Sequence, residues 1–172
     1  MKRSELPFMP EYHDKYILKT DDVELLDAIQ ISIDELNPEL TGKLIALGDQ
    51  VYAPGKWTVK DILQHLIDTA RVFTYRALCF SRKDAQKMPF FIENDYAASA
   101  EANRRTVESL VDELLLVTRG FKAMYESFTP EMLLRKGMGF KGFYSIDSRL
   151  ESYKFGNNKS QETQKTFNGN DQ

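Results

Sequence analysis

His13 and His65 are the two histidines that this sequence offers for chemistry. A site that needs three imidazoles from one chain therefore cannot be built. His65 and Asp68 are three residues apart in a segment with helical spacing, so they share a helix face, and an imidazole beside a carboxylate is half of a metal site. The same spacing also fits a histidine at the edge of a helix bundle that hydrogen-bonds to its neighbour, and spacing does not decide between the two.

The other residues that commonly carry catalysis occur in unpromising surroundings. Cys79 has no histidine in its helical turn to activate its thiol, so a buried, unreactive thiol is predicted. Trp57 precedes a helix cap and is expected to pack on that helix. The sequence contains no glycine-rich phosphate loop, Ser-His-Asp set or CxxC pair, so the catalytic residues stay unassigned.

The charge of the chain bears on its partners. Lys plus Arg number 23 and Asp plus Glu number 26, which leaves a net charge of -3, and no basic block is longer than a pair. This balance disfavours nucleic acid. Five arginines have spacings that favour solvated helix faces: Arg71, Arg76, Arg104, Arg105 and Arg119. An arginine that instead faces a pocket can hold an anion.

Hydropathy and cysteine content bear on the compartment. The longest apolar runs, such as Leu114 to Val117, are far below the ~18 residues that span a bilayer, and no export signal follows Met1. Cys79 is the single cysteine and cannot form an internal disulfide. We therefore expect a cytoplasmic protein that does not enter a membrane.

The clearest predicted helix comes from a stripe of apolar residues at spacings of three and four. The stripe runs from Val107 to Phe128. Extended back to about Asp95, the helix would hold about 33 residues and span ~50 Å, so it needs partners along its sides. A helix bundle supplies such partners.

Further stripes predict the other helices. One helix is expected from about Val59 to Arg82, with Thr58 as its N-cap and Asp61 in its first turn. An earlier helix is expected between Asp22 and Leu36, with residues 20–22 as its cap region, and Pro38 begins a short segment that ends near Leu47. Strand-like alternation is confined to short pieces, so the predicted fold class is all-α, a bundle with antiparallel neighbours.

The end of the chain has a different composition. Residues 156–172 contain one large apolar residue, Phe167, among mainly polar residues and glycines. A segment of this kind cannot bury enough apolar surface to fold by itself. We expect one helical domain over residues 1–155 and a disordered polar tail over residues 156–172.

One run of the sequence resembles a known family. Residues 52–69 read Tyr-Ala-Pro-Gly-Lys-Trp-Thr-Val-Lys-Asp-Ile-Leu-Gln-His-Leu-Ile-Asp-Thr. This run resembles the DinB-like family, whose second helix opens with Pro-Gly-Lys-Trp-Ser/Thr and carries a His-Leu-Ile-Asp motif. The similarity covers roughly residues 7–138. It implies an up-and-down-type four-helix bundle that is often dimeric, so a homodimer is expected.

The resemblance also implies a divalent metal, such as nickel or zinc, held by one histidine of the second helix and two of the last. His65 matches the first ligand. The last helix of the family carries a Gly-His-Glu-x-His-His motif, but residues 143–146 here resemble only the approach to it and residues 156–161 read Gly-Asn-Asn-Lys-Ser-Gln. Both remaining ligands are missing, so the last helix is expected to be degenerate or truncated. Ala70 also replaces a glutamate that many relatives have, and this removes a carboxylate that would support the site.

Two functions follow from the resemblance. The family includes metal-dependent thiol transferases and proteins assigned as hydrolases, so it implies an enzyme of one of these types. With His65 as one of three ligands, this chain is expected to bind metal weakly or not at all and to be inactive. The alternative is a non-catalytic helical bundle that acts as a dimerisation or binding module.

Overall fold

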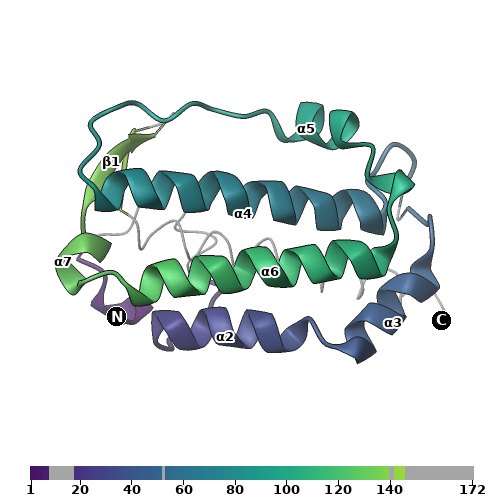
Figure 1. Cartoon of the computed structure of the whole chain (residues 1–172), viewed down its shortest axis with the longest axis horizontal. Coiled ribbons are helices and arrows are strands. Elements are labelled where there is room, and N and C mark those ends of the chain that lie inside the picture. Colours follow the sequence, from purple (N-terminus) through teal and green to yellow (C-terminus); the bar gives the residue numbers. More distant parts are fainter. Residues whose placement is uncertain (8–17, 52, 140–141, 146–172) are drawn as a thin grey trace.

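Three long helices define the frame of the molecule. The computed structural model describes residues 1–7, 18–51, 53–139 and 142–145. Helix α6 (Val107–Glu126) contacts both α2 (Leu25–Glu35) and α4 (Val59–Ser81). Figure 1 shows α4 between α5 and α6, with α2 on the other side of α6. The predicted helical bundle is confirmed.

Helix α4 begins where the sequence predicts. The Thr58 side chain accepts a hydrogen bond from the backbone N–H of Asp61 at 3.2 Å, and the Asp61 carboxylate accepts one from the backbone N–H of Thr58 at 3.0 Å. This reciprocal capping box satisfies two backbone donors that the helix leaves open. The helix then runs 23 residues to Ser81, one residue short of its predicted end.

The helix predicted from the stripe Val107–Phe128 is confirmed as α6, but its extension back to Asp95 is wrong, because the chain from Glu93 onward is divided into three pieces. These are α5 (Glu93–Ala100), a 3-10 turn η2 (Ala102–Arg104) and α6. Glu101 takes a left-handed conformation with φ 47° and ψ 44°, which a continuous right-handed helix does not allow. Thr106 then caps α6 by accepting a hydrogen bond from the N–H of Ser109. A polar break and a new cap thus end one amphipathic pattern and start another.

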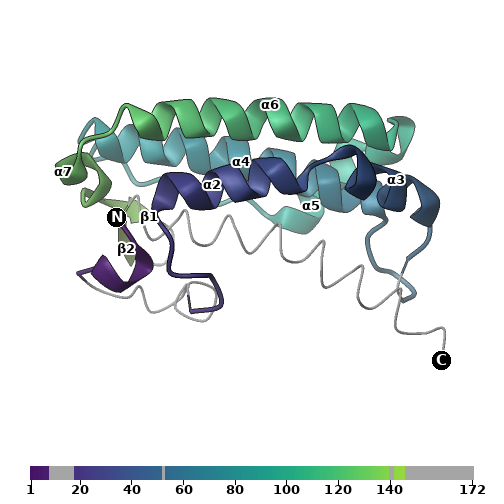
Figure 2. The same ribbon diagram turned by 90° about the horizontal axis from the view of Figure 1, so that it is seen from below.

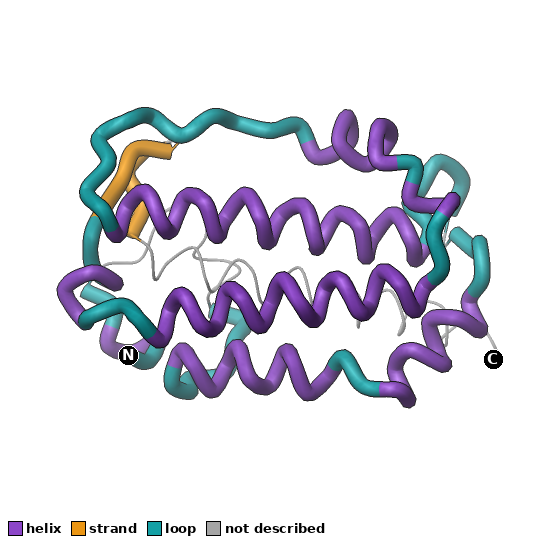
Figure 3. Tube along the Cα trace, viewed as in Figure 1, coloured by secondary structure: helices purple, strands orange, loops and turns teal. Residues whose placement is uncertain are grey.

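Two of the long helices run in the same direction. The first half of α4 packs on the first half of α6 in the cluster that contains Leu63 and Leu110, and the second halves share the cluster that contains Phe80 and Phe121. The connection over residues 82–106 returns along the bundle and contains α5 (Figure 3). The antiparallel arrangement that we expected between neighbours therefore holds for α2 and α6 but not for α4 and α6.

The first two helices are close to the prediction. Asn37 caps α3 (Pro38–Leu47) by accepting a hydrogen bond from the N–H of Leu40, and Pro38 occupies the first helical position. Helix α2 begins at Leu25, later than expected, so the predicted cap at residues 20–22 is wrong. The Asp22 carboxylate instead accepts a hydrogen bond from the backbone N–H of Ser4, in the 3-10 turn η1 (Arg3–Glu5).

The core consists of two clusters along these helices. One joins α2 to the second halves of α4 and α6, and the other joins α3 to their first halves. Figure 2 shows that α6 lies to one side of both α2 and α4. The largest fully buried apolar side chains are Phe80, Phe121, Ile67, Leu110 and Leu114. No helix among the described residues is both long and apolar enough to cross a membrane.

A short hairpin follows the last described helix, α7 (Pro130–Leu133). Strands β1 (Lys136–Gly139) and β2 (Gly142–Ser145) are antiparallel, with Lys136 opposite Ser145. A Cβ at Gly137 would overlap the buried ring of Phe80, so this close approach of β1 to α4 requires glycine. The expected degenerate last helix and the expected tail over residues 156–172 lie outside the described residues.

Candidate functional site

His65 lies on the first half of α4 and is half-buried. Its ring centroid is 4.9 Å from that of Trp57, and its Nδ1 is 3.5 Å from the hydroxyl oxygen of Thr69. Trp57 thus packs on α4, as predicted. The second histidine of the sequence, His13, lies outside the described residues.

Asp68 shares the helix with His65 but is engaged elsewhere. One carboxylate oxygen of Asp68 accepts a hydrogen bond at 3.0 Å from the side-chain amide of Gln64, a residue that is 8% exposed. Within the part of the chain that the structure describes, no group of three or more His, Cys, Asp or Glu side chains is placed to hold a metal ion. Among these residues, His65 therefore lacks the further ligands that a nickel or zinc site needs.

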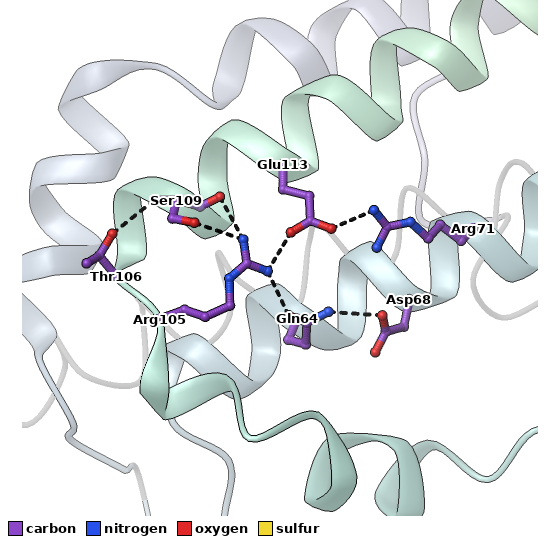
Figure 4. Close-up of polar contacts among 7 residues, drawn as sticks. All are labelled: Gln64, Asp68, Arg71, Arg105, Thr106, Ser109 and Glu113. Atoms are coloured by element: carbon purple, nitrogen blue, oxygen red, sulfur yellow. Dashed lines mark hydrogen bonds and ion pairs between the residues drawn. The ribbon is translucent and has the colours of Figure 1, made fainter.

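A polar network joins α4 to the start of α6 next to Asp68 (Figure 4). The guanidinium of Arg105 donates hydrogen bonds to the side-chain oxygen of Gln64 at 3.0 Å and to the hydroxyl of Ser109 at 2.9 Å. It also forms an ion pair with Glu113 at 2.5 Å, and the other oxygen of Glu113 pairs with Arg71 at 2.5 Å. We call these residues, with Asp68, the Glu113 network.

The electrostatics of this network favour an ionised Glu113. Partial burial by itself would raise the pKa of the carboxyl, but hydrogen bonds from Arg71 and Arg105 outweigh it and hold that pKa below its ordinary value of 4.5. The side chain of Glu113 is 25% exposed. The Glu113 network links the parallel helices α4 and α6 through charged side chains. Sequence analysis did not predict it, because the residues that it joins across the two helices are about 40 positions apart.

A pocket of about 310 Å³ lies between α4 and the segment that leads into α5. We call it the α4–α5 pocket. Its lining is mostly aromatic and apolar, with two arginines, and consists of Arg71, Val72, Tyr75, Arg76, Pro89, Phe90, Phe91 and Tyr96. Three of the aromatic side chains are about half exposed: Tyr75 at 57%, Phe90 at 56% and Tyr96 at 47%.

Arg76 is the buried charge of this pocket. The residue is 9% exposed, so the expectation that it lies on a solvated face is wrong. Its Nη2 donates a hydrogen bond of 2.5 Å to the backbone oxygen of Pro89, and its guanidinium carbon is 5.7 Å from the ring centroid of Phe73 and 5.9 Å from that of Phe91. These contacts fix the orientation of the guanidinium at the pocket wall.

Cys79 is buried, as predicted. Hydrogen bonding with Cys79 is the main cause that raises the pKa of the Tyr75 hydroxyl. The phenol of Tyr75 therefore stays neutral near pH 7, and Tyr75 lines the pocket.

Comparisons with known proteins give one family and two similar folds. Residues 24–155 match the family model described as the DinB superfamily. YfiT from Bacillus subtilis, described as a probable metal-dependent hydrolase with an unusual four-helix bundle topology, superposes with a TM-score of 0.69 and 13% identity, over 94% of this chain and 89% of its own. No curated protein matches the sequence significantly.

A second solved structure is the mycothiol-dependent maleylpyruvate isomerase, with a TM-score of 0.62 and 10% identity. The match covers 83% of this chain and 61% of that one, so the chain spans less than two thirds of the isomerase. At these identities the likenesses show the fold alone.

Proposed function

This chain belongs to the DinB superfamily, and from that premise we propose that it is a non-catalytic binding member in which His65 is the remnant of a metal site. The observation that carries the proposal is that no group of three or more His, Cys, Asp or Glu side chains among the described residues is placed to hold a metal ion. An indole N–H only donates, so Trp57 supplies no ligand atom, and a neutral hydroxyl such as that of Thr69 is a weak one. Asp68 is held by Gln64 on the side of the Glu113 network.

The small number of histidines in the whole sequence also supports a chain that does not hold nickel or zinc tightly. A zinc or nickel site of imidazole type draws two or three histidines together, and this sequence has His13 as the single histidine besides His65. Even with both histidines as ligands, a cation at His65 would thus need carboxylates to complete its coordination, and carboxylates hold these metals less tightly than imidazoles. The residues described do not fit a tightly held nickel or zinc ion.

A metal-dependent enzyme of thiol-transferase or hydrolase type is the second candidate. His65 stands at the position of the first ligand in the family motif, on a helix that the capping box at Thr58 holds in place. The two similar structures are described as a probable metal-dependent hydrolase and a mycothiol-dependent isomerase, which is consistent with this candidate. We further propose that the protein forms a homodimer in the cytoplasm and does not bind nucleic acid.

Titration calorimetry of the full chain with Zn²⁺ and with Ni²⁺ separates the two candidates. The binding role predicts dissociation constants weaker than about 1 μM, or less than about 8 kcal/mol of binding free energy, against roughly 10–16 kcal/mol for structural zinc. His65→Ala should abolish the remaining weak binding, and Leu116→Ala, which changes an exposed side chain on α6, is the control. Submicromolar 1:1 binding that His65→Ala removes and Leu116→Ala keeps would favour the metal-dependent enzyme.

A further inference from the structure

Exposed apolar side chains gather where α4 meets the segment that leads into α5. Tyr75 and Leu78 lie about one turn apart on α4, at 57% and 39% exposure. Phe90 and Ile92 precede α5 at 56% and 53%, and Tyr96 of α5 is 47% exposed. Because Tyr75, Phe90 and Tyr96 all line the α4–α5 pocket, the two elements contribute to one surface. We call these five residues the α4–α5 patch.

The size of this patch is suited to an interface. Large side chains that are about half exposed leave on the order of 100 Å² each to solvent, or roughly 500 Å² for the patch. The largest apolar patch of a typical monomer is about 300–600 Å² and is often functional. A standard interface takes about 800 Å² from each partner, so the patch and a polar rim together supply what a stable dimer needs.

The two ends of the patch carry opposite charge. Exposed cations follow the end of α4, and exposed anions occupy the first turn of α5. The cations are Arg82, Lys83 and Lys87, and the anions are Glu93 and Asp95. The segment between them returns along α4, so these charges lie at opposite ends of it (Figure 1).

Two further charges near the ends have partners within the chain. Asp84, at the cationic end, is half-buried and accepts a hydrogen bond of 2.9 Å from the backbone N–H of Gln86. Arg71, which lines the pocket near the anionic end, forms an ion pair with Glu113 at 2.5 Å. Neither charge reverses the sign of its end.

We propose that the α4–α5 patch docks a second copy of this chain across a two-fold axis near Tyr75. A two-fold axis reverses the direction of the patch, so the cationic end of one copy faces the anionic end of its partner. This charge complementarity selects a second copy as the occupant, and the pocket of about 310 Å³ has room for an aromatic side chain of the partner. The assignment rests on the homodimer proposed above and names the surface that forms it.

Sedimentation velocity of the full chain from about 1 to 100 μM tests the assignment. At low salt the parent should sediment as a dimer in the upper part of this range. Ile92→Asn should weaken the dimer about tenfold or more, because it removes an apolar contact from the patch. Ile92 is the N-cap of α5, a position that favours asparagine, so the fold should tolerate this change. The matched control is Ile31→Asn on α2, at 46% exposure, which should leave the dimer unchanged.

Charge reversal tests the two-fold arrangement. Lys83→Glu and Glu93→Lys should each weaken the dimer several-fold, since like charges then meet at both ends of the interface. The double variant should recover most of the parent's affinity, because it exchanges the two signs. Lys43→Glu on α3 is the control for a change of charge and should have no effect. A double variant as weak as the sum of the single variants would overturn the arrangement.

The remaining outcomes separate this assignment from the proposed function. A dimer that Ile92→Asn leaves intact would overturn the assignment and keep the homodimer. A parent that stays monomeric at 100 μM would refute both, and binding of the neutral probe indole that Tyr96→Ala removes would then identify the pocket as a small-molecule site. Tight metal binding by a dimer that Ile92→Asn dissociates would refute the non-catalytic role and support the assignment.

Discussion

Replacing Glu113 by glutamine removes the charge that joins Arg71 to Arg105 and keeps the size of the side chain. The ion pair with Arg71, whose side chain is 53% exposed, is of the exposed kind and contributes ~0.2–1 kcal/mol. The pair with Arg105, whose side chain is 29% exposed, lies at the upper end of that range or slightly above it. We therefore expect Glu113→Gln to lower the free energy of unfolding at pH 7 by about 1–2 kcal/mol.

The effect has a defined pH dependence. Because hydrogen bonds lower the pKa of folded Glu113 below 4.5, the contribution to stability is fully present above the pKa of the unfolded chain and is lost as pH falls through the folded value. The difference between parent and variant should thus stay constant from pH 7 to about pH 5 and shrink at lower pH. High salt should also reduce this difference in the free energy of unfolding, because it screens the ion pairs of Glu113.

Urea denaturation across this pH range measures the effect. The matched control is Glu126→Gln on the same helix, where the carboxylate makes an i,i+4 pair with Lys122, and about 0.5 kcal/mol or less should be lost. An equal loss in the two variants, or a Glu113→Gln loss that does not change with pH, would refute the view that Glu113 is a charged clamp between α4 and α6.

Two further pairs of substitutions test the packing. Gly137→Ala should lower the free energy of unfolding by more than about 2 kcal/mol, because the new methyl group overlaps the buried Phe80 ring. Gly120→Ala, in open space on α6, should raise this free energy by about 0.5–1 kcal/mol. If urea denaturation shows that both substitutions change the free energy of unfolding in the same direction, the contact of β1 with α4 is contradicted. His65→Ala should cost no more than about 1 kcal/mol, while Leu66→Ala, at 3% exposure, should cost about 2–5 kcal/mol. Similar losses in the same assay would show that His65 is chiefly a core residue.

Local signals in the sequence were sufficient for most helix boundaries. The box of Thr58 and Asp61 and the cap of Asn37 before Pro38 act over three residues, so they can be read without knowing the fold. The break at Glu101 could not be read in this way, because the residue has no intrinsic preference for a left-handed conformation. Nor does an apolar stripe state the direction of its partner, and this is why the parallel pair of α4 and α6 was missed.

The candidate site was only partly predictable for a related reason. His65 stands out because histidine is scarce and because a contiguous motif surrounds it. The Glu113 network and the α4–α5 pocket join residues from different elements, and only tertiary packing brings them together. Arg76 shows this most clearly, since its spacing suits a solvated face and the segment at Pro89 nevertheless covers it.

The metal content of the purified full chain, prepared without an affinity tag, tests the central claim most directly. Elemental mass spectrometry should find nickel and zinc well below one equivalent per chain, and dialysis against a chelator should remove what is there, because the residues that the structure describes include no group of three or more ligands for a metal ion. One equivalent of nickel or zinc that survives the chelator would contradict the account and show that the chain assembles a metal centre from further ligands.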